Sequence, residues 1–401
     1  MPYPPDTGGK QDTFFLLREF SRLGHEVTAG IVYHGDDPDK APEEFAGLVK
    51  EMVFLPGNPK PLHSRLLSSL SDDVPFKFRK YHSEQALRDV VDCVSGEGAF
   101  DIILSDHFHL APLALDARSV VEREGGRVPL LVLRTPNVES TIVQKYAERV
   151  DNPLLKAFAN REARKMKRYE ARSIDMFDLV AAISPIDRDV LREISAHPET
   201  IICVTAGADV DRLLPPEKPP KPGEVVFVGS FDWQPNADGA MWLVEKVWPK
   251  VIGEFSGAHL SLVGKNPPPY LEKAAGPGIT LTGRVDSVEE YVARAACCVV
   301  PLWIGSGMRF KILEAFALAR AVVSTSLGAE GIEAEDGKHI LIRDDPDEFA
   351  DAVIGLLRSP ERREELGRNA RALVERKYSW KQVARGFSDA IETLVVSRAG
   401  A

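Results

Sequence analysis

The sequence predicts an α/β protein made of two Rossmann-like domains, each built on a doubly wound parallel sheet, that face each other across a cleft. Three observations support this fold class. The chain has 401 residues, more than one hydrophobic core usually holds. Short apolar runs of strand length alternate with segments of helical length throughout. A segment rich in proline and lysine, residues 213–224, interrupts this alternation near the middle and is the best candidate for a linker.

In the first half, the apolar runs alternate with amphipathic or charged segments. The predicted strands are 27–33, 52–55, 100–105, 130–134, 179–183 and 201–205. The predicted helices are 11–23, 62–94, 153–175 and one that begins at residue 187. Because strands that alternate with helices form βαβ units, we expect these strands to be parallel.

The same pattern restarts after the linker. The predicted strands are 225–228, 259–263, 279–282, 297–302, 321–325 and 339–342, and the predicted helices are 236–255, 309–320, 346–358, 361–378 and 379–396. We therefore predict an amino-terminal domain over residues 1–207 and a carboxy-terminal domain over 208–379. The last helix, within 380–401, is expected to pack back onto the first domain.

Composition excludes several classes of function. A formal net charge of −10 argues against a nucleic-acid partner. All four cysteines lie in apolar runs without C-x-x-C spacing, as is typical of core residues in a reducing compartment. No run of 18 apolar residues and no signal-peptide pattern is present. We expect a cytoplasmic protein that needs no metal cofactor, since no His, Cys or Asp cluster has metal-ligand spacing.

Residues 299–326 contain the pattern with the most chemical content. Gly305, Ser306 and Gly307 form a short loop after a predicted strand, and Arg309 and Lys311 lie in the first turn of the helix that follows. A helix start carries unpaired N–H groups and a positive dipole end, so cations are out of place there unless an anion binds. We interpret the stretch as a diphosphate site. The alternative, a solvated basic helix start, explains fewer of these features together.

Polar residues follow the predicted strands of the first half. Gly8 and Gly9, His107, Asn137 and Ser184 lie just after a strand, or where one is expected. Ligands of open parallel sheets bind at the carboxyl ends of the strands. These residues are therefore expected to gather at one edge of the sheet.

Several segments resemble one known family. The segments of the second half are VVFVGSFDWQPNADGAMWL, LSLVGKNP, ITLTGRV, VVPLWIGSGMRFKILEAFALARAVVSTSLGAEGI and LGRNARALVERKYSW. Looser matches in the first half are PYPPDTGG, FSRLGHEVT, FDIILSDHFHLAP, RTPNVES and DLVAAISPIDRDVL. Together they resemble the family-4 (group 1) glycosyltransferases of the GT-B fold. The resemblance implies transfer of a sugar from a nucleotide-diphosphate donor to a glycan or lipid-linked acceptor, with retention at the anomeric carbon.

The chain departs from the family pattern in two places of the second half. Many members carry two glutamates separated by seven residues; Glu314 fits the second, but Ser306 stands at the first. Many members also carry an Arg and a Lys after the first strand of the second domain, whereas residues 231–236 contain neither. Arg309 and Lys311 are expected to supply these cations from the other side of the diphosphate, as in a subgroup with a G-S-G-x-R-x-K loop.

A third departure lies at the beginning of the sequence. Relatives begin with an apolar strand that leads into the loop resembling residues 2–6, and here that strand is missing because Met1 is followed at once by Pro2. We expect either that the natural start lies upstream or that the first sheet is incomplete.

The resemblance assigns roles to individual residues. His107, Arg309 and Lys311 are the expected catalytic residues. The residues expected to contact the donor are Gly8, Gly9, Gly229, Ser230, Gly283, Arg284, Val285, Gly305, Ser306, Gly307, Glu314, Glu330 and Gly331. His109, Asn137 and Glu139 are expected on the acceptor side.

Simpler structural interpretations compete with some of these roles. Glu314 is three residues from Lys311, which is the spacing of a salt bridge within a helix. The alternative for Arg284 is a solvated cation in a loop, and the alternative for Glu330 is a carboxylate that caps a helix. His109 is the rival of His107 for the reacting sugar, and the two point to opposite faces if the chain is extended there.

No pair of carboxylates is spaced like the nucleophile and acid of a glycosidase. We therefore expect a front-face reaction in which the leaving phosphate takes the acceptor's proton. Two alternative functions stay open from the sequence: a nucleotide-sugar epimerase of the same fold, and a non-catalytic nucleotide-sugar-binding protein.

A stripe of basic residues lies along the predicted helix 153–175. It contains Lys156, Arg161, Arg164, Lys165, Lys167, Arg168 and Arg172, and Lys77, Arg79 and Lys80 lie upstream. One interpretation is peripheral contact with an anionic membrane that holds a lipid-linked acceptor, on the cytoplasmic face. The sequence favours the other, a solvated helix with Glu162 and Glu170 as partners.

Overall fold

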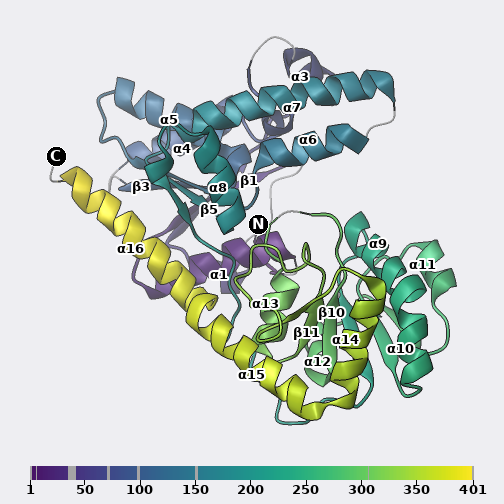
Figure 1. Cartoon of the computed structure of the whole chain (residues 1–401). Coiled ribbons are helices and arrows are strands. Elements are labelled where there is room, and N and C mark those ends of the chain that lie inside the picture. Colours follow the sequence, from purple (N-terminus) through teal and green to yellow (C-terminus); the bar gives the residue numbers. More distant parts are fainter. Residues whose placement is uncertain are drawn as a thin grey trace. The chain divides into compact units, whose positions relative to one another are not determined.

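The computed structural model describes residues 2–5, 7–34, 42–69, 73–96, 100–149, 152–305 and 307–399. The chain divides into two compact units, Met1–Thr205 with Ala384–Ala401, and Ala206–Val383 (Figure 1). Both units are α/β structures with parallel sheets, as the alternation of strands and helices predicted. The predicted domain limits at residues 207 and 379 stay a prediction.

The first unit contains two parallel sheets among its described residues. One pairs β1 (Thr28–Tyr33) with β2 (Glu51–Pro56). The other has the order β3-β4-β5-β6, with bounds Ile102–Asp106, Leu130–Thr135, Leu179–Ala182 and Ile201–Cys203. Every residue of β4 and β5 is buried, which explains why these strands are apolar runs rather than alternating patterns.

Over residues 62–94, the helices of the first unit differ from the prediction. They are α1 (Gly8–Arg22), α2 (Glu43–Ala46), α3 (Leu62–Ser69), α4 (Glu84–Ser95), α5 (Ala111–Arg123), α6 (Glu139–Arg149), α7 (Pro153–Ile174) and α8 (Pro185–Ile194). The single helix predicted over 62–94 is wrong. Pro75 begins a separate 3₁₀ turn, η1 (Phe76–Lys80), and the Ser83 hydroxyl then caps α4 by accepting the N–H of Ala86 at 3.0 Å.

Helices α2, α5 and α6 were not predicted from the sequence. Helix α5 follows a second 3₁₀ turn, η2 (Phe108–Leu110), and α6 begins directly after the loop that follows β4. A third 3₁₀ turn, η3 (Pro198–Thr200), precedes β6. The core between the sheet and these helices includes Phe78, Phe108, Leu131, Leu133 and Met166.

The last helix, α16 (Trp380–Ala399), begins in the second unit and belongs to the first from Ala384 onward. Within the first unit, the ring of Phe387 lies 5.7 Å from that of Phe20. The Ser388 hydroxyl lies 2.6 Å from Nε2 of His25. These contacts attach the end of the chain to α1.

The second unit is built on a six-stranded parallel sheet with the order β12-β11-β10-β7-β8-β9. The strands β7 to β12 are Glu224–Val228, His259–Val263, Ile279–Gly283, Cys297–Val300, Val322–Ser324 and Leu341–Ile342. The two central strands, β10 and β7, are almost entirely buried. All four cysteines are free, and burial raises the pKa of the Cys298 thiol to about 12.

One helix of the second unit, which the sequence predicted as continuous, contains an irregular turn. They are α9 (Gln234–Trp242), α10 (Trp248–Glu254), α11 (Pro269–Ala274), α12 (Val288–Arg294), α13 (Phe310–Ala317), α14 (Pro346–Arg358) and α15 (Pro360–Lys377). The helix predicted over 236–255 is interrupted by a π-helical turn, Leu243–Val247. Pro249 lies just after this turn and lacks the N–H that a regular helix would use there. No helix in the described ranges is both long and apolar enough to cross a bilayer.

Gly207 allows two distant segments of the second unit to pack together. Ala208 donates its N–H to the Tyr378 carbonyl at 2.7 Å and accepts that of Trp380 at 3.2 Å. A Cβ atom on Gly207 would lie 2.6 Å from Cδ2 of Trp380, whose side chain is 2% exposed.

We predict that Gly207→Ala destabilises the protein by about 1–3 kcal/mol, because the buried indole has no room to shift. Thermal unfolding followed by circular dichroism measures this effect. Gly253→Ala, in α10 and with nothing within 4 Å of an added Cβ, is the matched control and should be neutral or slightly stabilising. Equal melting temperatures for Gly207→Ala and the wild type would contradict the prediction.

Candidate active site

In the second unit, the predicted donor-binding residues follow the carboxyl ends of neighbouring strands. Gly229 and Ser230 follow β7, and Gly305 and Gly307 follow β10. Strands β7 and β10 are parallel neighbours, with Cys297 opposite Val225. The two loops therefore leave the same edge of the sheet side by side. Ser306, expected in this loop, lies outside the described residues.

A hydrogen-bond chain joins these two loops. The Lys311 ammonium donates to Oδ1 of Asn236 at 2.9 Å, and Nδ2 of Asn236 donates to the Ser230 carbonyl at 2.8 Å. The Asn236 side chain lies so close to Gly229 that a Cβ there would be 2.6 Å from its amide carbon. Asn236 was not among the predicted site residues; its polar side chain directly after the loop was the available signal.

Arg309 is the N-cap residue of α13 and is 6% exposed. Its Nη1 donates to the Gly307 carbonyl at 2.5 Å, so the guanidinium folds back over the glycine loop. Gly305 has φ +144°, and a Cβ there would lie 2.6 Å from Nη2 of Arg309 and 3.1 Å from the Trp233 ring. The loop therefore requires a glycine at position 305 both for its backbone conformation and for the approach of Arg309.

Burial and the nearby charge of Arg309 both affect Lys311. Burial, and then the charge of Arg309, lower the pKa of Lys311 to about 7, while Glu314 opposes this shift. The Lys311 ammonium also lies 4.6 Å from the centre of the Phe227 ring. Two confined cations beside a helix start make this edge of the sheet a site that an anion would stabilise.

Four other predicted donor residues follow strands β9 and β11 of this sheet, and Glu314 lies in α13. Gly283, with φ +66°, ends the outermost strand β9, and Arg284 after it is exposed, with Val285 half-buried. Glu330 and Gly331, the latter with φ +81°, lie in the loop that follows β11. Nothing here tests their roles toward a donor, and those roles stay predictions.

In the first unit, a buried ion cluster brings α1 to the ends of β3 and β4. Arg134 is fully buried, and its Nη1 and Nη2 contact the Asp12 carboxylate at 2.6 and 2.7 Å. Nη1 also donates to Oδ1 of Asp106 at 3.0 Å, and the Thr13 hydroxyl donates to Oδ2 of Asp106 at 2.5 Å. Gly8 and Gly9, the first residues of α1, are thereby held near the edge where His107 lies.

The three charges of this cluster shift one another's pKa values. Burial raises the pKa of Asp12, and Arg134 opposes that rise. Burial acts in the same direction on Asp106, but the charges of Arg134 and His107, together with hydrogen bonds from Thr13 and Arg134, outweigh it and the pKa of Asp106 is lowered. The two carboxylates raise the pKa of Arg134 despite its burial. The sequence analysis missed this cluster, because its members are far apart in the chain.

His107 has an unusual backbone conformation, with φ 130°. Its N–H donates to the Arg134 carbonyl at 2.9 Å, and its carbonyl accepts the Ser105 hydroxyl at 3.2 Å. Its Nδ1 is buried without a hydrogen-bond partner among the described residues. A strained, well-held residue with an available ring nitrogen is typical of a functional site.

His109 lies against His107, with ring centroids 5.1 Å apart. The two rings were expected on opposite faces only if the chain is extended, and it is not extended here because η2 begins at Phe108. His109 stacks on Tyr81 at 4.1 Å, and burial, followed by the charges of His107, Lys77 and Lys80, lowers its pKa to about 3. His109 is therefore neutral at physiological pH.

The two other acceptor-side candidates follow β4. The carbonyl of Asn137 accepts the Thr135 hydroxyl at 2.6 Å. Glu139 is 6% exposed, and its carboxylate pairs with Lys77 at 2.5 Å. Glu170 does not serve the basic stripe of α7 as the sequence suggested; it accepts the N–H groups of Glu139 and Ser140 and caps α6, and burial raises its pKa to about 7.

The chain resembles known proteins in sequence. Residues 222–359 match the family model described as glycosyl transferases group 1. An "uncharacterized 44.6 kDa protein in cps region" of Klebsiella pneumoniae is 24% identical, over 95% of each chain. D-inositol 3-phosphate glycosyltransferase 2 of Catenulispora acidiphila is 26% identical over 250 residues, which is 55% of this chain and 57% of that protein.

Solved structures share its fold. Sucrose-phosphate synthase from Thermosynechococcus elongatus matches with a TM-score of 0.69 and 16% identity, over 98% of this chain and 94% of that one. Anabaena Alr3699/HepE, solved in complex with UDP, matches with a TM-score of 0.65 and 12% identity, over 96% of each chain.

The two parallel-sheet units and these structural relatives show that the chain has the GT-B fold. Residues 222–359, which contain the Arg309–Lys311 loop, are similar to the group 1 glycosyl transferases. The particular subgroup with a G-S-G-x-R-x-K loop stays a prediction.

We predict that Arg134→Met destabilises the protein by about 3–5 kcal/mol at pH 7, because it leaves two buried carboxylates without their cation. Without Arg134, the pKa values of both carboxyls rise above those of the unfolded chain. The folded variant then binds more protons than the unfolded one, so its loss of stability is largest at pH 7 and smaller at pH 5. Urea unfolding at both pH values measures this.

Arg127→Met is the matched control, because Arg127 is 62% exposed and its pair with Asp101 should contribute less than about 1 kcal/mol. A loss of stability for Arg134→Met that is the same at pH 5 and pH 7 would contradict the prediction.

Proposed function

We propose that the protein is a retaining glycosyltransferase that moves a sugar from a nucleotide-diphosphate donor to a glycan or lipid-linked acceptor. One observation carries the proposal: Arg309 and Lys311 are confined at the start of α13, and the pKa of Lys311 is lowered to about 7. Holding two cations so close is unfavourable until an anion of matching charge binds between them and the helix start.

The diphosphate is the part of the donor that suits this site. Its oxygens accept hydrogen bonds from a guanidinium and an ammonium, and the same contacts stabilise the charge that develops on the leaving phosphate. Support for a uridine nucleotide comes from one structural relative, Anabaena Alr3699/HepE, which was solved in complex with UDP. We propose UDP as the first nucleotide to test.

The first unit supports a front-face reaction with retention. Asp12 and Asp106, the carboxylates nearest His107, are committed to Arg134 and are not available as a nucleophile. In the proposed step the acceptor hydroxyl attacks the anomeric carbon, the bond to the leaving phosphate breaks, and that phosphate takes the acceptor's proton. His107 supports the sugar by hydrogen bonding, and no metal is required.

A place in polysaccharide or glycoconjugate synthesis is part of the proposal. Its support is the Klebsiella pneumoniae relative called "uncharacterized 44.6 kDa protein in cps region", which matches over 95% of each chain. The identity of the sugar and of the acceptor is left to experiment.

The test measures turnover of a panel of nucleotide sugars with the wild type, Arg309→Ala and His107→Ala. We expect Arg309→Ala to lose at least 100-fold in kcat/KM through the lost diphosphate contact, and His107→Ala to lose activity while still binding nucleotide. NMR of the product then reports the anomeric configuration.

Arg358→Ala is the control, because this arginine is 55% exposed and lies at the end of α14. Wild-type turnover by a folded Arg309→Ala variant would contradict the diphosphate assignment. An inverted product would contradict retention, and an epimerised free sugar nucleotide formed without acceptor would favour the epimerase.

The lowered pKa of Lys311 predicts that binding of UDP depends on pH. Lys311 must take up a proton to bind the anion once the pH exceeds about 7. The Kd for UDP should therefore rise by up to tenfold per pH unit between pH 7.5 and 9. Isothermal titration calorimetry in buffers of different ionisation enthalpy measures both the Kd and the proton uptake.

Lys311→Met should bind UDP weakly and without this pH dependence. The same substitution should raise the melting temperature of the free protein at pH 7, since it removes a buried charge. Lys265→Met is the control, because this lysine is 47% exposed in the loop after β8 and should leave the pH dependence as it is. A pH-independent Kd for the wild type would contradict the prediction.

A further inference from the structure

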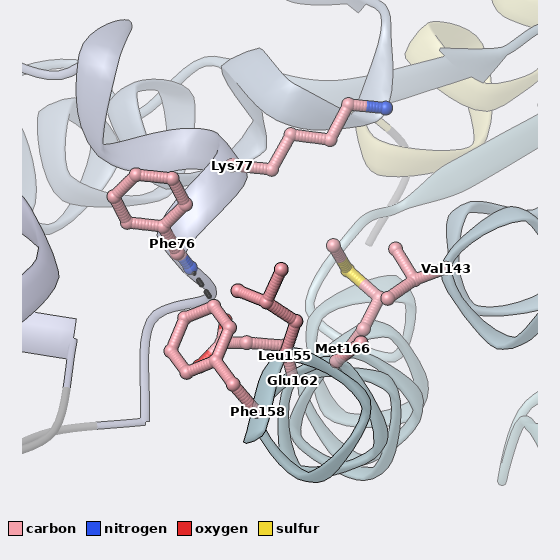
Figure 2. A pocket seen from close by; sticks show the side chains of 8 residues that line it. Phe76, Lys77, Val143, Leu155, Phe158, Glu162 and Met166 are labelled. Carbon is pink, nitrogen blue, oxygen red and sulfur yellow. Dashed lines mark hydrogen bonds between the residues drawn. The ribbon is translucent and has the colours of Figure 1, made fainter. Parts of the chain in front are cut away.

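The first unit contains an apolar pocket between η1, α6 and α7 (Figure 2). Its volume is about 360 Å³, within the range of small-molecule sites. It is lined by Phe76, Lys77, Val143, Leu155, Phe158, Ala159, Glu162 and Met166. The lining is almost entirely hydrocarbon and aromatic, so the pocket suits an apolar ligand.

The polar groups of the lining already bind other groups of the protein. The Glu162 carboxylate accepts the N–H of Phe76 at 2.9 Å, which Figure 2 marks with a dashed line. The Lys77 ammonium pairs with Glu139 at 2.5 Å. The rings of Phe76 and Phe158 lie 6.5 Å apart, edge to face, and form one aromatic wall.

The opening of the pocket lies beside exposed leucines. Leu155, which lines the pocket, is 61% exposed, and its neighbour Leu154 is 83% exposed. Two large apolar side chains side by side at the start of a helix are unfavourable in water unless something covers them. Their position beside an apolar pocket indicates that one ligand covers both.

The surface around the pocket is basic, although the whole chain has a net charge of −10. The exposed cations of α7 are Lys156, Arg164, Lys167, Arg168 and Arg172, and η1 carries three Lys or Arg residues and no acid. Lys165 is buried, Arg172 pairs with Asp73, and Arg161 pairs with Glu162, which also accepts the N–H of Phe76. Glu170 is used by α6. This surface complements a ligand that combines a hydrocarbon chain with an anionic group.

The pocket is connected to the expected acceptor side of the first unit through η1. Lys77 lines the pocket and pairs with Glu139, while Tyr81, the residue that follows η1, stacks on His109. Phe78 of η1 packs against Phe108, next to His107, with ring centroids 5.3 Å apart. A molecule with its chain in the pocket would therefore direct its polar end past Lys77 toward the histidines.

We propose that this pocket holds the hydrocarbon chain of a lipid-linked acceptor, with the acceptor's phosphate beside Lys77. The inference rests on the proposed glycosyl transfer and narrows its acceptor to an amphiphile with an anionic head group.

The test measures binding of dodecyl phosphate, below its micelle concentration, to the full-length protein by isothermal titration calorimetry without any nucleotide sugar. Each methylene buried in the pocket is worth about fourfold in affinity. Dodecyl phosphate should therefore bind at least about 100-fold more tightly than butyl phosphate.

Ala159→Phe fills the pocket and should weaken binding of dodecyl phosphate at least tenfold. Ala157→Phe is the matched control, because it adds the same ring to an exposed position of the same helix and should bind like the wild type. Leu155→Asn is a second variant at a largely exposed position; it should fold normally and also bind dodecyl phosphate more weakly.

Equal affinity for dodecyl and butyl phosphate would overturn the proposal, since surface cations alone would explain it. Equal affinity of Ala159→Phe and the wild type would overturn it as well. A wild-type dimer that Leu155→Asn dissociates, together with no binding of dodecyl phosphate, would assign the surface to a second copy of the chain instead.

Since no nucleotide sugar is present, these outcomes are independent of those for the proposed transfer reaction. If the chain transfers sugar but fails to bind dodecyl phosphate, only the pocket assignment fails. If it binds dodecyl phosphate but turns over no nucleotide sugar, the proposed function fails, and with it the assignment of the bound amphiphile as a sugar acceptor.

Discussion

The arrangement of the first unit depends on the buried guanidinium of Arg134. It holds Asp12 of α1 and Asp106 of β3 at the end of β4, and the backbone of the same arginine accepts the N–H of His107. A buried charge is tolerated only when its partners are close and well oriented, so these groups have little freedom to move. The position of α1 and the strained conformation of His107 both follow from this one cluster.

The buried cation of the second unit, Lys311, has different surroundings from Arg134. Lys311 has an amide oxygen and an aromatic ring as neighbours, with Arg309 nearby, and its pKa is lowered accordingly. Arg134 is neutralised within the protein, whereas the charge of Lys311 is not. The first arrangement suits a rigid scaffold, and the second suits a site whose missing negative charge arrives with a ligand.

Helix α7 shows how one segment serves both structure and binding. Its carboxylates point inward, where Glu170 caps α6 and Glu162 holds η1 in place. Lys156, Arg164, Lys167 and Arg168 are exposed on the outside of the helix, whereas Arg161 pairs with Glu162. The same packing leaves an apolar pocket open beside Leu155, so a basic surface and an apolar cavity adjoin because the acids are used elsewhere.

The sequence by itself determined the strands, the parallel sheets and the glycine loop before Arg309 and Lys311, because these depend on local periodicity and on spacing within a few residues. It failed over residues 62–94, where Pro75 begins a separate 3₁₀ turn, and it missed the π-helical turn before Pro249 in the helix predicted over 236–255. Only the tertiary structure decided the pairing of Arg134 with Asp12, 122 residues away, and of Lys311 with Asn236, 75 residues away. Buried polar groups pair with partners from any part of the chain, so a local sequence pattern does not predict these pairs.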